Sequence, residues 1–120
     1  MAHQQYNACI AACHACADAC DHCCIACLGE PEPRRLARCV ALDIDCAQIC
    51  RFAAAAMSRG SEFAGAVGGF CAEICEACEA ECAKHAHDHC QMCAEACRRC
   101  AEACRIMSAQ APMPVETTSI

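Results

Sequence analysis

Cysteine recurs along this chain in alternating steps of three and four residues, and this spacing constrains the fold more than any other feature. Residues three and four apart lie on one face of an α-helix, so each run places its sulfur atoms in a single stripe. The alternation is that of the core positions of a helical bundle, where leucine and isoleucine usually pack. The sequence therefore predicts helices that turn a face of thiols toward a common core. The cysteines on the predicted stripes are Cys9, Cys13, Cys16, Cys20, Cys23, Cys27, Cys39, Cys46, Cys50, Cys71, Cys75, Cys78, Cys82, Cys90, Cys93, Cys97, Cys100 and Cys104.

Helix-forming residues, mainly alanine with charged side chains, fill the chain between a few breaks at glycine and proline. Gly29 with Pro31 and Pro33 makes one break, and Gly60 lies in another. Short connections between long helices favour antiparallel neighbours, so the predicted fold is all-α, an up-down-up-down four-helix bundle with a cysteine-lined core. The predicted helical segments are residues 3–28, 34–57, 62–84 and 88–107.

The predicted domain organisation is a single bundle over residues 1–108 followed by a short C-terminal tail. Residues 109–120 contain Pro112 and Pro114 and carry no cysteine, so we expect them to form a flexible tail. A chain of 120 residues is long enough for one such domain.

The second predicted helix keeps the stripe but replaces some of its cysteines. Its stripe contains Leu36, Ala53 and Met57, and Asp43 takes a position where a cysteine is expected. A carboxylate in a core is costly without a partner, so Asp43 is either a metal ligand or a hydrogen-bond acceptor, with a histidine as one possible donor. Cys24 is the one cysteine beside the stripe rather than on it, and we predict it as a metal ligand together with the cysteines of the stripe.

Two interpretations of the cysteine pattern do not involve metal. Cysteine can pack as a small apolar side chain, but 18 of 19 cysteines on one stripe exceed what simple filling requires. The other interpretation is that the cysteines form disulfides. Residues 1–5 lack the basic and apolar regions of a secretory signal, so we expect a cytoplasmic protein whose thiols are kept reduced.

Thiolate is a soft ligand that selects Cu(I), zinc or iron–sulfur clusters. Structural zinc requires separate tetrahedral sites, whereas Cu(I) accepts two or three thiolates and a sulfur can bridge two ions. One Cu(I) for each thiolate also leaves the core neutral, so we expect about 15–20 Cu(I) ions per chain. A zinc or cadmium buffer and a thiol enzyme are the alternatives, but no single cysteine stands out as an activated nucleophile, and no catalysis is expected.

The two ends of the predicted bundle differ in chemistry. One end gathers His85 and His87, which we predict to bind metal where copper enters, with a smaller role for His89. The opposite end gathers apolar side chains and is predicted to be closed. These side chains are Tyr6, Met57, Phe63, Val67 and Met107.

Charge and hydropathy exclude two classes of partner. The formal net charge is −6, which disfavours nucleic acid, and the chain contains no run of apolar residues long enough to cross a membrane. Ile25, Ile44 and Phe52 point away from the cysteine stripe, so we expect a homo-oligomer.

The cysteine pattern resembles that of the bacterial copper storage proteins over about residues 6–107, and the absence of a leader matches their cytosolic branch. The resemblance implies a homotetramer of four-helix bundles, each storing many Cu(I) ions on its inward cysteines. The motifs that carry it are Cys9-x3-Cys13-x2-Cys16-x3-Cys20, Cys71-x3-Cys75-x2-Cys78-x3-Cys82 and Cys90-x2-Cys93-x3-Cys97-x2-Cys100-x3-Cys104.

Overall fold

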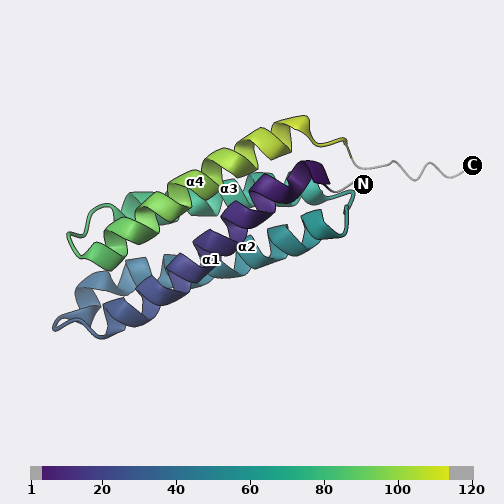
Figure 1. The fold of residues 1–120 in the computed structure, drawn as a ribbon. Coiled ribbons are helices and arrows are strands. Elements are labelled where there is room, and N and C mark those ends of the chain that lie inside the picture. The colour runs from purple at the N-terminus through teal and green to yellow at the C-terminus, as the bar shows by residue number, and fades with distance from the viewer. Residues whose placement is uncertain (1–3, 114–120) are drawn as a thin grey trace, which may run out of the picture.

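Four long antiparallel helices make up the computed structural model, which describes residues 4–113 (Figure 1). The chain runs up and down through the helices in order, and each helix packs against two neighbours: α1 against α2 and α4, and α3 against α2 and α4. The predicted all-α four-helix bundle is therefore confirmed. The helices are α1 (Asn7–Leu28), α2 (Ala37–Ser58), α3 (Ala64–Cys82) and α4 (Asp88–Gln110).

The observed helix ends lie within a few residues of the predicted ones, and the differences have local causes. The helix α2 begins at Ala37 because Pro33–Leu36 first form a 3-10 turn, with proline at its first position. The helix α4 continues to Gln110, so it includes the first two residues of the predicted tail. The predicted start at residue 3 and tail residues 114–120 lie outside the described residues, and the domain boundary stays a prediction.

The end of the bundle near the two termini is closed by large side chains, as predicted. Tyr6, Met57 and Met107 are buried there. A Cβ on Gly68 would overlap with Cε of Met107, so the missing side chain at this glycine makes the space that Met107 occupies. Phe63, which we predicted to help close this end, is instead 55% exposed because it precedes the first turn of α3.

The outer surface carries several large apolar side chains. Ile25, Ile44 and Phe52 are exposed, as their positions opposite the thiol stripe predict, and Phe63 and Phe70 add to the apolar surface on the side of α3. None of the helices in residues 4–113 combines the length and the apolar character that crossing a membrane requires.

The turn between α2 and α3 depends on one glycine. Gly60 has a φ of 64°, a left-handed conformation that costs other residues about 1–2 kcal/mol. We predict that Gly60→Ala lowers the melting temperature by roughly 4–8 °C per kcal/mol lost, measured by circular dichroism on reduced protein. Gly60→Asn should lose less, because asparagine tolerates this conformation. Equal melting temperatures for all three proteins would contradict this account of the turn.

Candidate metal centre

The cysteines of all four helices meet in one continuous column along the bundle axis. The 18 cysteines of the stripes are buried, and Cys24, which lies beside the stripe, is half-buried. All nineteen are free thiols. The helices therefore place the cysteines as the spacing predicted, and small alanines such as Ala17, Ala47 and Ala72 fill the spaces between the helices.

Sulfur atoms of different helices are in contact throughout the half of the column nearest the closed end. The Sγ atoms of Cys9 and Cys104 lie 3.6 Å apart, and the distance from Cys50 to Cys75 on α3 is 3.7 Å. Deeper in the bundle, Cys16 lies 3.7 Å from both Cys46 and Cys97. These contacts connect α1, α2, α3 and α4 through sulfur alone.

The column continues to the other end of the bundle with similar spacing. Cys93 lies 3.7 Å from Cys20, Cys39 lies 3.0 Å from Cys82, and Cys27 lies 3.7 Å from Cys90. Cysteines four apart on one helix are also close, as the 3.7 Å between Cys23 and Cys27 shows. A metal ion could therefore be held within one helix or between helices.

Several sets of four thiols have all their sulfur atoms within 4.8 Å of one another, and neighbouring sets share members. Cys16 and Cys46, for example, belong to two sets. A shared thiolate can bridge two ions, which fits a chain of metal ions better than isolated tetrahedral sites. Five such sets are Cys13, Cys71, Cys100 and Cys104; Cys16, Cys46, Cys50 and Cys75; Cys16, Cys20, Cys46 and Cys97; Cys20, Cys78, Cys93 and Cys97; and Cys23, Cys27, Cys39 and Cys90.

Asp43 is fully buried inside this column, at the stripe position predicted for it. Its Oδ1 accepts hydrogen bonds from the thiols of Cys78 at 3.4 Å and Cys82 at 3.6 Å, and it lies 3.2 Å from the sulfur of Cys93. The thiol of Cys39 lies 3.9 Å from Oδ2. The partners of Asp43 are therefore thiols of α2, α3 and α4, and not the histidine considered from the sequence. Burial, and then the negative charge of Cys93, raise the pKa of Asp43 from 3.8 to about 8.

Burial raises the pKa of these thiols, whereas hydrogen bonds between thiols raise the pKa of some and lower that of others. Burial raises the pKa of Cys90 to about 11 and also raises the pKa of Cys24. Hydrogen bonds from Cys23 and Cys82 lower the pKa of Cys39. A thiolate is therefore stabilised where neighbouring thiols can donate to it, and a metal cation would extend this stabilisation to the other cysteines by displacing their protons.

The end of the column opposite Tyr6, Met57 and Met107 carries His85, His87 and His89 and is called the open end. His89 is the residue there that the sequence reasoning undervalued. Its side chain is only 12% exposed, and its Nδ1 lies 3.6 Å from Cys23, 3.7 Å from Cys27 and 3.5 Å from Cys90. Its Nε2 lies 2.8 Å from Glu30. The signal in the sequence is that His89 precedes Cys93 by four residues, which places both on the same face of α4.

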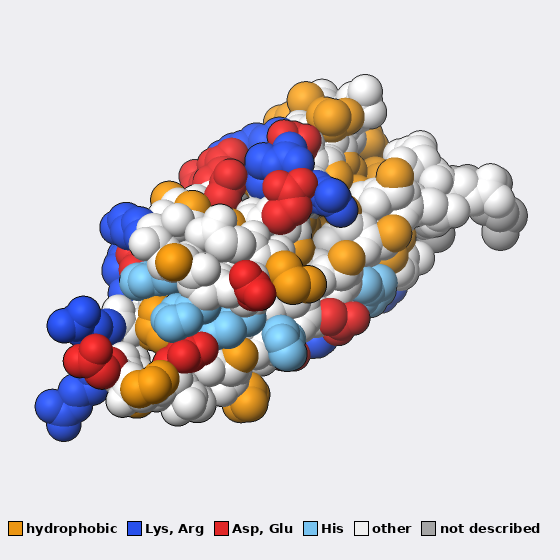
Figure 2. All heavy atoms as spheres, turned by 60° about the vertical axis from the view of Figure 1, so that its left-hand side comes forward, with side chains coloured by type: hydrophobic (Ala, Val, Ile, Leu, Met, Phe, Trp, Pro, Cys, Tyr) orange, Lys and Arg blue, Asp and Glu red, His pale blue; other side chains and the backbone are white. Residues whose placement is uncertain are grey.

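The two histidines predicted as ligands lie further out. His85 Nε2 is 3.0 Å from Oε2 of Glu81, and none of its hydrogen bonds reaches a thiol. His87 is 42% exposed, and its ring stacks on that of His89 with centroids 5.3 Å apart. Histidines gather at this end of the molecule between acidic and basic side chains (Figure 2).

The raised pKa of Asp43 predicts how the stability of the reduced, metal-free protein depends on pH. Between about pH 4 and 8 the folded state keeps a proton on Asp43 that the unfolded state releases, so stability is lost as pH rises toward 8. The loss is at most about 1.4 kcal/mol per pH unit. Asp43→Asn removes this contribution. The free energy of unfolding, measured by urea unfolding from pH 5 to 8, should therefore decline less steeply in this variant than in wild type. If the free energy of unfolding depended on pH in the same way in the variant and in wild type, the raised pKa of Asp43 would be contradicted.

Comparison with known proteins identifies relatives with the same organisation. Residues 2–109 match the copper storage protein family. An uncharacterised cysteine-rich protein of Bacillus subtilis (strain 168), YhjQ, is 51% identical over 94 residues, which cover 78% of this chain and 87% of the relative.

Solved structures agree with this match. The Cu(I)-bound copper storage protein BsCsp3 is 50% identical, with a TM-score of 0.85 over 88% of this chain and 99% of its own. A cytosolic copper storage protein of Streptomyces lividans, with five coppers, is 41% identical, with a TM-score of 0.88 over 92% of this chain and 98% of its own. The chain belongs to the copper storage protein family.

Proposed function

We propose that this protein stores many Cu(I) ions on its core thiolates and performs no catalysis. The observation that carries the proposal is the continuous column of buried sulfur atoms, in which neighbouring sets of four thiols share members. A catalytic thiol would need a distinct, accessible setting, whereas these thiols are equivalent in kind and buried. The copper-bound relatives support the same function.

Electrostatics sets the capacity of the column. Uncompensated charge in the bundle interior is costly, so each thiolate that forms needs a cation beside it. The ion Cu(I) matches a thiolate charge for charge, and a filled core is neutral at roughly one copper per cysteine. Divalent zinc in separate tetrahedral sites takes four thiolates per ion, which leaves each site with a charge of −2 inside the bundle.

The open end is where copper enters in this proposal. His89 with Cys23, Cys27 and Cys90 forms a first binding site there, because its Nδ1 faces all three thiols. His85 and His87 remain predicted ligands at the outer rim. Asp43 lies further along the column, where its carboxyl group accepts hydrogen bonds from thiols and is also a predicted copper ligand.

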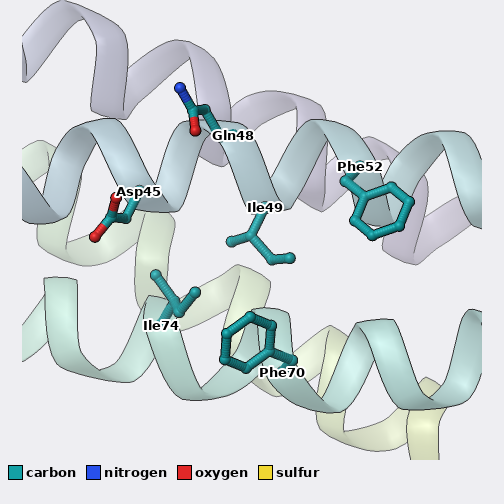
Figure 3. Close-up of a pocket in the computed structure, with 6 residues that line it drawn as sticks. All are labelled: Asp45, Gln48, Ile49, Phe52, Phe70 and Ile74. Carbon is teal, nitrogen blue, oxygen red and sulfur yellow. The ribbon is translucent and has the colours of Figure 1, made fainter.

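Cellular location and assembly are part of the proposal. A cytoplasmic location is supported by the cytosolic relative from Streptomyces. A homotetramer is supported by apolar side chains on the outer face of α2 and α3. Ile49, Phe52, Phe70 and Ile74 line a groove of about 500 Å³ between these helices, with Asp45 and Gln48 at one end (Figure 3). Burying two exposed phenylalanines against another copy would remove them from water.

Anaerobic titration of the reduced protein with Cu(I), against a chromophoric chelator of known affinity, tests storage. We expect tight uptake to continue to about 15–20 ions per chain, with roughly one proton released per cysteine engaged. Cys24→Ser serves as the matched control, because this half-buried cysteine lies outside the column and its loss should change capacity by one ion at most. Saturation at one or two ions would refute storage.

Sedimentation tests the assembly. We expect the wild-type protein to sediment as a tetramer and the double variant Phe52→Glu, Phe70→Glu to dissociate, because each change places a charge on the apolar groove. The change Ile106→Glu, at an equally exposed apolar residue on α4, should leave the tetramer intact. A monomeric wild-type protein would contradict the proposed assembly, and a tetrameric double variant would place the interface elsewhere.

A further inference from the structure

Glu30 links the two loops that border the open end of the column. It lies in the connection between α1 and α2, and its Oε2 is 2.8 Å from Nε2 of His89 and 3.5 Å from Nδ1 of His87. The side chain of Glu30 is 25% exposed, and the two imidazole rings are parallel to within 5°. One carboxylate therefore holds a pair of stacked histidines at the beginning of α4.

The hydrogen bond to Glu30 determines which nitrogen of His89 carries the hydrogen. A carboxylate only accepts hydrogen bonds, so the short contact places the N–H on Nε2. In the neutral ring the other nitrogen then has a free lone pair. That nitrogen, Nδ1, is the one that lies 3.5–3.7 Å from the sulfur atoms of Cys23, Cys27 and Cys90.

We infer that Glu30 is a positioning residue for copper uptake: it holds the ring of His89 so that the Nδ1 lone pair faces the three outermost thiols. This inference rests on the proposed function, since it assigns a role in filling the store. A histidine that binds metal through one nitrogen commonly donates from the other to a carboxylate, which fixes its orientation and increases its basicity. Glu30 is placed to do this for His89.

Two other carboxylates of this end, those of Glu81 and Glu32, pair with other side chains. Glu81 pairs with Arg38, Lys84 and His85. Glu32, two residues beyond Glu30 in the same loop, is 69% exposed and pairs with Arg35. Glu32 thus offers a matched control, because removing it takes the same charge from the same loop without touching His89.

Stopped-flow mixing of reduced, metal-free protein with Cu(I), below one ion per chain, tests the inference. We expect Glu30→Ala to slow uptake about tenfold, the lower end of the effect of removing such a partner. Glu30→Gln should keep most of the rate, because the amide oxygen can still accept from Nε2. Glu32→Ala should match wild type. The final capacity should stay unchanged in all three, which separates this test from the test of storage itself.

The His89→Ala background decides whether Glu30 acts through the imidazole. If it does, adding Glu30→Ala to His89→Ala causes no further slowing. Equal slowing in both backgrounds, or a Glu30→Ala rate equal to that of wild type, would overturn the inference. Nitrogen-15 NMR of the histidine side chains provides a second readout: the Nε2–H signal of His89 should shift in Glu30→Ala and stay in place in Glu32→Ala.

Discussion

The contact between one buried thiol and the next is the interaction on which this structure depends. Cysteine is small and apolar enough to occupy the core positions of a bundle, so the helices come together through sulfur and alanine rather than through leucine. Sulfur–sulfur distances of 3.6–4.0 Å recur between helices and within them. The same side chains that fill the core are therefore those that could hold metal ions, so the fold and the candidate metal site are one feature.

The two ends of the column differ because different side chains cover them. Tyr6, Met57 and Met107 close one end, and Gly68 makes room for a methionine there. The other end carries His89, which contacts the partly exposed carboxylate of Glu30 through Nε2 and the buried thiol of Cys90 through Nδ1. In the proposed function, a copper ion that enters at this end binds first between Nδ1 of His89 and the thiols that it faces.

The periodicity of the cysteines was enough to predict the bundle, the buried stripe and the burial of Asp43, because a strict repeat leaves only one face for the core. The side chains of the turns could not be placed in the same way. His85, His87 and His89 alternate in the sequence, yet only His89 faces the thiols, because α4 begins at Asp88 and its first turn carries His89 inward. Phe63 was misplaced for a similar reason, since it lies just outside α3.

The central claim is that copper fills a connected column in which thiolates bridge neighbouring ions. Copper-edge X-ray absorption of the protein loaded with about half its capacity tests this most directly. The account predicts a first coordination shell made almost entirely of sulfur, together with scattering from nearby copper ions. A shell dominated by nitrogen and oxygen, or isolated copper ions without copper neighbours, would contradict it.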